Sequence, residues 1–66
     1  MQNKIKSERK RLGISQEQLA KQCEVTRQTM NAIENDKYDP SLSLAFKLSK
    51  NVNISIEDLF EYDGRD

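Results

Sequence analysis

A single cysteine, Cys23, and the absence of histidine are the features that most restrict how this 66-residue chain can fold. An intrachain disulfide needs two cysteines, and the usual structural zinc sites need four cysteine or histidine ligands. Without such links, the core of so small a domain supplies a stability of only about 3–5 kcal/mol. We therefore expect one domain over residues 1–66, stabilised by close helix packing or by association with a partner.

The charges are unevenly distributed, although 11 Lys and Arg balance 11 Asp and Glu. Residues 1–37 hold eight basic and five acidic side chains, and residues 38–66 hold three and six. A net charge of zero argues against a nucleic-acid-binding domain, which is usually basic. The division into a basic and an acidic half instead allows one side to face a polyanion, with a merely solvated surface as the alternative.

Helix start and stop signals recur at short intervals. Ser15, Thr26, Ser41 and Ser55 are typical N-caps, and Ser15 with Gln18 predicts a capping box. Gly13 and Asn53 tolerate the left-handed conformation that ends many helices. The sequence therefore predicts five helices: from Asn3 or Lys4 to Leu12, from Ser15 to about Cys23, Arg27 to Asn35, Leu42 to Val52, and a short one that opens at Ser55 and includes Leu59 and Phe60.

The apolar residues are too few for a membrane protein. They make up 35% of the chain and form no run near the roughly 20 residues that a membrane span needs. No apolar stretch typical of a signal peptide follows the charged N-terminus. We expect a soluble, cytoplasmic protein without a membrane partner.

The second and third predicted helices are separated by only a few residues, which is typical of a helix-turn-helix over about residues 15–35. The segments ISQEQLA (14–20), VTRQTMNAIEN (25–35) and PSL (40–42) resemble the lambda-repressor-like, or Xre-type, DNA-binding family. The similarity is greatest to short regulators of the cytolysin-repressor type, which are bacterial or phage-encoded. It implies an all-α, compact five-helix domain. Many members have glycine where this chain has Glu24 and Asp36, so we expect strain or altered dihedrals in both turns.

The third predicted helix turns Met30 and Ile33 inward and Arg27, Gln28 and Asn31 outward. In a helix-turn-helix this outward face meets base edges in the major groove, and Arg, Gln and Asn carry suitable hydrogen-bonding groups. The family resemblance implies base contacts by these three, and to a lesser degree by Ala32. It implies phosphate contacts by a flanking set: Gln16, Thr26, Thr29, Asn35, Lys37 and Tyr38. It also implies that Gln16 braces Arg27, the first residue of the third helix. The alternatives are a solvated polar helix face and, for Tyr38, packing under Pro40.

Several other residues have structural interpretations. Arg9 and Glu34 fall on the inward faces of two helices, and family members carry such a pair, so we expect a salt bridge that orients the third helix. Cys23 is expected to be a small buried hydrophobic residue. The fourth helix is expected to bury Leu42, Ala45, Leu48 and Val52 and to present Leu44 and Phe46 as extra apolar surface.

The resemblance also implies a homodimer that is built on the fifth helix and the end of the fourth. The candidate interface residues, which are shared with the core, are Val52, Ile54, Ile56, Leu59 and Phe60, and spacing alone does not decide which of them face the partner. Met1–Asn3 with Phe60–Tyr62 could form a two-stranded ribbon. The predicted function is a transcriptional regulator, most simply a repressor that binds an inverted repeat in double-stranded DNA. The alternative is an antitoxin or protein-interaction module with secondary DNA binding. We expect no catalytic residues, metal, cofactor or small-molecule ligand.

Overall fold

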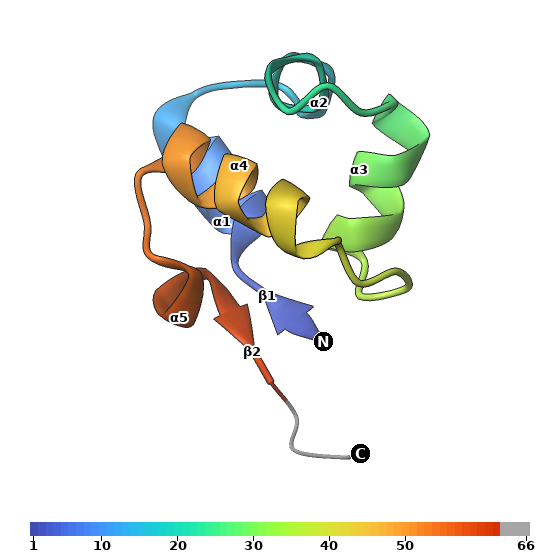
Figure 1. The fold of residues 1–66 in the computed structure, drawn as a ribbon. Coiled ribbons are helices and arrows are strands. Elements are labelled where there is room, and N and C mark those ends of the chain that lie inside the picture. The colour runs from blue at the N-terminus through green and yellow to red at the C-terminus, as the bar shows by residue number, and fades with distance from the viewer. Residues whose placement is uncertain (63–66) are drawn as a thin grey trace.

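The computed structural model describes residues 1–62 and shows five helices with one two-stranded sheet. The helices are α1 (Ile5–Leu12), α2 (Gln16–Gln22), α3 (Arg27–Glu34), α4 (Leu42–Val52) and α5 (Ile56–Leu59), and the strands are β1 (Gln2–Asn3) and β2 (Phe60–Glu61). Figure 1 shows α2 nearly end-on while α3 lies in the plane of the view, so the two helices cross steeply. The predicted all-α domain with a terminal ribbon is confirmed.

Hydroxyl side chains start four of the five helices. Ser15, Thr26, Ser41 and Ser55 each accept the backbone N–H of the residue three positions later. These bonds satisfy N–H groups that have no partner inside the helix. Gln18 returns a bond from its Oε1 to the Ser15 N–H at 2.7 Å, which completes the predicted capping box. Local chemistry thus sets where these helices begin.

The first helix begins later than its earliest predicted start. Asn3 belongs to β1, where it pairs with Phe60 in an antiparallel register, and Gln2 pairs with Glu61. The Lys4 side chain makes no capping bond, and Asn3 Oδ1 accepts the Ile5 N–H at 3.1 Å instead. A helix that included Asn3 would lose the ribbon, so α1 begins at Ile5.

One hydrophobic core receives side chains from every helix. Its fully buried members are Ile5, Leu19, Cys23, Met30, Ile33, Leu48, Val52 and Leu59. The burial of Cys23, at 1% exposed, agrees with its expected role as a small hydrophobic residue. Burial also raises the pKa of its thiol, and nearby Lys47 lowers it to a smaller extent.

The predicted inward face of α4 was wrong at two positions. Leu44 is buried, whereas Leu42 is 71% exposed. The buried stripe is Leu44, Ala45, Leu48 and Val52. Because six of the eleven α4 residues are apolar, the periodicity allows more than one inward face, and contact with α1 and α5 selects between them.

Among residues 1–62, three residues other than glycine adopt the left-handed conformation: Glu24 at φ 62°, Asp36 at φ 61° and Asn53 at φ 60°. Asn53 ends α4 as expected, and Glu24 and Asp36 occupy the two turns in which many family members have glycine. A side chain with a Cβ is unfavourable in this region by roughly 1–2 kcal/mol. Both turns therefore adopt the left-handed conformation with a side chain that has a Cβ, and the expected strain is present.

Gly13 gives a direct measure of this backbone preference. It follows α1 at φ +73°, and a Cβ added there would meet no atom within 4 Å. Gly13→Ala should lower the free energy of unfolding by about 1 kcal/mol, because only the backbone conformation is penalised. Gly13→Asn should lower the free energy of unfolding by less, since asparagine tolerates this conformation. Urea unfolding of the three proteins measures the difference, and equal losses for alanine and asparagine would contradict the argument.

Candidate nucleic-acid interface

The outer face of α3 carries three polar side chains. Arg27, Gln28 and Asn31 are exposed, whereas Met30 and Ile33 on the opposite face are at most 1% exposed. Positions i, i+1 and i+4 of a helix share one side. The structure therefore brings together, on one surface, the three residues predicted to contact bases.

Arg27, the first residue of α3, is held by a side chain from α2. Its Nε donates to Gln16 Oε1 at 3.4 Å, and Gln16 Nε2 donates to Glu34 Oε1 at 3.3 Å. The amide of Gln16 is thereby oriented with its oxygen toward Arg27. This leaves the two Nη groups of Arg27 as the outer donors of the guanidinium.

A buried ion pair lies behind this surface. Arg9 Nε and Nη2 donate to Glu34 Oε2 and Oε1 at 3.0 and 3.1 Å, and the two side chains are 11% and 2% exposed. Arg9 Nη1 also donates to the Ile14 carbonyl at 3.1 Å. The pair ties α1 to the last residue of α3, as the sequence led us to expect. Its link to Gln16 was not foreseen.

The residues predicted to contact phosphate lie around α3 in different settings. Gln16 is half-buried at the first turn of α2, and Lys37 and Tyr38 are exposed in the connector after α3. Tyr38 is 54% exposed, which disfavours the alternative of packing under Pro40.

Three further members of the predicted phosphate-contacting set already have partners inside the chain. The Thr26 hydroxyl, besides its capping role, donates to the Thr29 hydroxyl at 3.0 Å. Asn35 Nδ2 donates to the carbonyl of Asn31 at 2.8 Å and to Asn31 Oδ1 at 3.3 Å. These contacts order the edge of the surface before any ligand is present.

The predicted dimer residues divide into two groups. Val52 and Leu59 are 0% exposed and belong to the core of this chain, which is one of the two places that the sequence allowed for them. Ile54, Ile56 and Phe60 are half-buried. An apolar residue at the end of α4 or in α5 can pack in the core or face a partner. Only the packing of α4 on α5 shows which of these residues are buried in the core.

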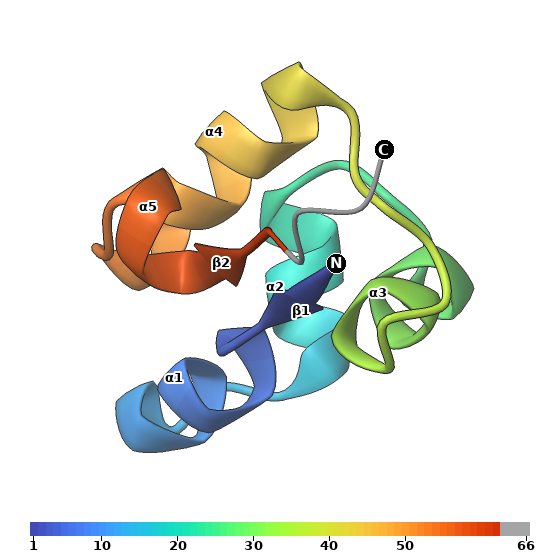
Figure 2. The same ribbon diagram turned by 90° about the horizontal axis from the view of Figure 1, so that it is seen from below.

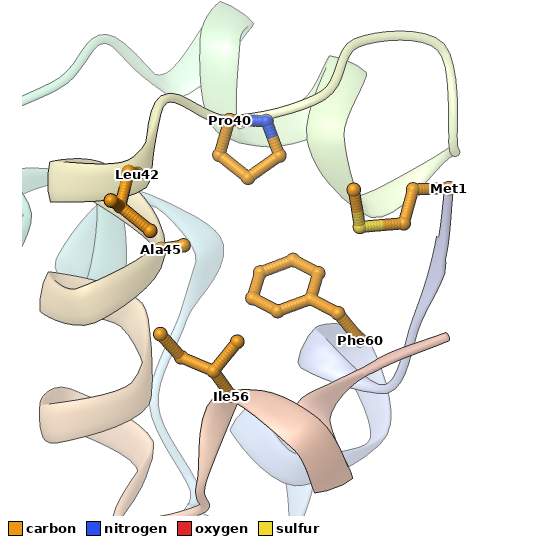
Figure 3. A pocket seen from close by; sticks show the side chains of 6 residues that line it. All are labelled: Met1, Pro40, Leu42, Ala45, Ile56 and Phe60. Atoms are coloured by element: carbon orange, nitrogen blue, oxygen red, sulfur yellow. The ribbon is translucent and has the colours of Figure 1, made fainter. Parts of the chain in front are cut away.

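An apolar groove opens beside α5. It has a volume of about 260 Å³ and is lined by Met1, Pro40, Leu42, Ala45, Ile56 and Phe60. Figure 3 shows the Phe60 ring and the side chains of Ile56 and Leu42 converging on this space. Sequence reasoning found Ile56 and Phe60 but missed the other four, which come from segments that are distant along the chain.

Residues 1–62 contain neither a cluster of metal-binding side chains nor a membrane-spanning helix. No three His, Cys, Asp or Glu side chains are grouped so that they could hold a metal ion. None of the helices in this part of the chain has the length and apolar character needed to cross a membrane.

A short turn between two crossed helices, the second of which presents polar side chains outward, defines a helix-turn-helix domain. Comparison with known proteins agrees with this class. The chain belongs to the lambda-repressor-like (Xre-type) helix-turn-helix family, since the family described as "Helix-turn-helix" matches residues 5–59.

Its relatives have similar lengths. The chain is 52% identical over 63 residues to an uncharacterized HTH-type transcriptional regulator of Methanocaldococcus jannaschii, with 96% of both chains covered. It is 50% identical over 60 residues to the uncharacterized HTH-type transcriptional regulator YgzD of Bacillus subtilis, with 91% of both covered. A further regulator of this description, from Archaeoglobus fulgidus, is 42% identical over 66 residues, covering 100% of this chain and 94% of its own.

Proposed function

We propose that this protein is a sequence-specific DNA-binding transcriptional regulator that acts as a homodimer and represses by occupying its operator. The observation that carries the proposal is the outer face of α3, where Arg27, Gln28 and Asn31 stand exposed together. In a helix-turn-helix, this face of the second helix enters the major groove. The names of the relatives, which are HTH-type transcriptional regulators, support it.

The hydrogen bonds of Arg27 and Asn31 within the surface support a specific base-contacting chemistry for each of these two side chains. With Nε of Arg27 engaged by Gln16, its two Nη groups suit guanine O6 and N7. Gln28 suits adenine, whose N6 and N7 match an amide. Asn31 Oδ1 accepts from Asn35, so Asn31 offers its Nδ2 to an acceptor on a base edge.

Phosphate contacts are assigned to the rim of this surface. Gln16 lies at the start of α2, and Asn35, Lys37 and Tyr38 follow α3 on the other side. Such contacts position a protein on the duplex without specifying its sequence. Thr26 and Asn35 contribute less, because the Thr26 hydroxyl donates to Thr29 and the Asn35 Nδ2 donates to Asn31, whereas the Thr29 hydroxyl keeps its own hydrogen to donate.

A second copy of the chain is the proposed occupant of the apolar groove. One recognition helix buries only about 600–1,000 Å² on DNA, so specific binding by a single domain is weak. The groove is apolar on all its sides, and Leu42, 71% exposed at its edge, can enter the groove of a twofold-related copy. Dimerisation would place two α3 helices about 34 Å apart, one turn of DNA.

Leu42→Asp tests this interface. The side chain is exposed and lies in the first turn of α4, where an acidic residue is favourable, so the monomer should remain folded. Two buried carboxylates in a dimer are strongly unfavourable, and we expect the dimer dissociation constant to rise at least about 100-fold. Sedimentation equilibrium measures it. Leu12→Asp, at a 41% exposed position on α1, is the matched control and should leave dimerisation unchanged.

Selection of bound duplexes from a random pool, with the mass of the protein measured in solution, tests the function as a whole. The proposal predicts an enriched inverted repeat with half-sites one helical turn apart, and a dimer bound to it. A monomer that enriches no sequence would contradict it. That result would favour a protein-interaction module, such as an antitoxin.

A further inference from the structure

The side chain of Asn3 joins the terminal ribbon to the end of the recognition helix. Its Nδ2 donates to the Ile33 carbonyl at 2.8 Å and to Asp36 Oδ1 at 3.1 Å. Its Oδ1 accepts the Ile5 N–H at 3.1 Å. One amide thus connects β1, the start of α1 and the turn that ends α3. Figure 2 shows β1 lying beside α3, between it and β2.

The turn that Asn3 contacts has a backbone conformation that is intrinsically unfavourable at Asp36. The Asp36 N–H bonds to the Ile33 carbonyl at 3.1 Å and the Lys37 N–H bonds to the Ala32 carbonyl at 2.9 Å, which is the usual double closure of a helix end. Asp36 adopts φ 61° there, a conformation in which a Cβ is unfavourable. The bonds from Asn3 to the Ile33 carbonyl and to the Asp36 carboxylate stabilise the same conformation from outside.

The ribbon is itself fixed in place, so Asn3 can act as an anchor. Asn3 pairs with Phe60 across the two strands. The Lys4 N–H donates to the Leu59 carbonyl at 2.9 Å, and Leu59 is fully buried in the core. Movement of the Asn3 amide would therefore require displacement of the ribbon or of α5.

We propose that Asn3 is a positioning residue of the DNA interface, which holds the end of α3 and the Asp36–Tyr38 segment so that Lys37 meets a phosphate. The inference rests on the proposed DNA-binding function. Asn3 itself need not touch DNA: it acts through a turn whose next residue carries the exposed cation Lys37. The ribbon thereby becomes part of the DNA-binding apparatus rather than only a closure of the termini.

Asn3→Asp separates this role from that of starting α1. The new carboxylate can still accept the Ile5 N–H, but it cannot donate to the Ile33 carbonyl and it faces the Asp36 carboxylate. We expect affinity for the selected operator to fall about tenfold or more. The slope of log K against log salt should also fall by about one per half-site, because one phosphate contact is lost. Fluorescence anisotropy over a salt series measures both.

Asn3→Asp with Asp36→Asn exchanges donor and acceptor across the pair. The new amide at position 36 can donate to the carboxylate at position 3, and asparagine tolerates the left-handed conformation. The double variant should recover most of the operator affinity and the wild-type salt slope. Adding Lys37→Ala to Asn3→Asp should weaken binding little further, whereas Lys37→Ala alone should reproduce the loss of slope.

Circular dichroism and urea unfolding show whether each variant is folded at the temperature of the binding measurement. Asn3→Asp that is folded and binds with wild-type affinity and slope would overturn the inference. So would a loss of affinity with an unchanged slope that the Asp36→Asn exchange does not restore. Failure of the wild-type protein to bind any DNA would instead overturn the proposed function, which makes the two failures distinguishable.

Discussion

Replacement of Arg27, Gln28 and Asn31 together by alanine should abolish specific binding to the selected operator. A well-formed contact to a base edge discriminates by about 1–3 kcal/mol, and a dimer loses each contact twice. We therefore expect a fall in affinity of at least about a thousandfold, to the level of nonspecific DNA. The fold should persist, because all three side chains are exposed and alanine favours helix.

The matched control removes one cation and one amide elsewhere. Gln22→Ala with Lys50→Ala changes exposed residues at the ends of α2 and α4, and neither is assigned a DNA contact. This variant should keep operator affinity within about threefold, as expected for surface substitutions remote from a contact. Competition with unrelated duplex in anisotropy titrations distinguishes specific from nonspecific binding. A triple variant that retained the wild-type preference for operator would exclude α3 as the recognition helix.

Arg9→Ala should bring the free energy of unfolding close to zero at 25 °C, so that a large fraction of the protein is unfolded. It leaves the Glu34 carboxylate, 2% exposed, without its charged partner. Removal of one member of a buried pair costs about 3–5 kcal/mol, which is comparable to the whole stability expected of so small a domain. Circular dichroism with urea titration measures the loss. Arg11→Ala is the control, because it breaks the more exposed Arg11–Glu8 pair and should cost less than about 1 kcal/mol.

A double substitution separates stability from DNA binding. Arg9→Met with Glu34→Met removes both charges from the interior, and apolar replacement of a buried pair is often neutral or stabilising. The variant should fold. It should nevertheless bind operator more weakly, because Gln16 loses Glu34 as the acceptor that orients its amide toward Arg27. If Arg9→Ala were no less stable than Arg11→Ala, the ion pair would not be the structural element that we describe.

The helix boundaries could be predicted closely because they depend on neighbours in the chain. A cap such as Ser15 or Thr26 bonds to an N–H only three residues away, so the spacing of residue types contains the information. The polar face of α3 followed from helical periodicity for the same reason. The charge partition was also informative, since the helix-turn-helix lies within the basic half.

Prediction was weaker where two arrangements have the same local pattern. Leu42 was predicted to be buried and Leu44 to be exposed, and the structure shows the reverse. The prediction failed because α4 carries apolar residues on more than one side. Val52 and Leu59 were candidates for both the core and a partner interface, and only the packed structure shows that they are fully buried within one chain. β1 and β2 have two residues each, too few for an alternating pattern to be seen.

The sequence by itself determined the number of helices and most of their boundaries, the helix-turn-helix and the side chains that α3 presents outward. The start of α1 and the assignment of Phe60 to β2 instead of α5 depended on the terminal ribbon. The tertiary structure decided the bond from Gln16 to Glu34 that links the expected Arg9–Glu34 pair to Arg27, the attachment of Asn3 to the end of α3, and the groove beside α5. The reason is physical. Caps and amphipathic faces arise from interactions over three or four residues, whereas these contacts join residues that become neighbours only when the helices cross and pack.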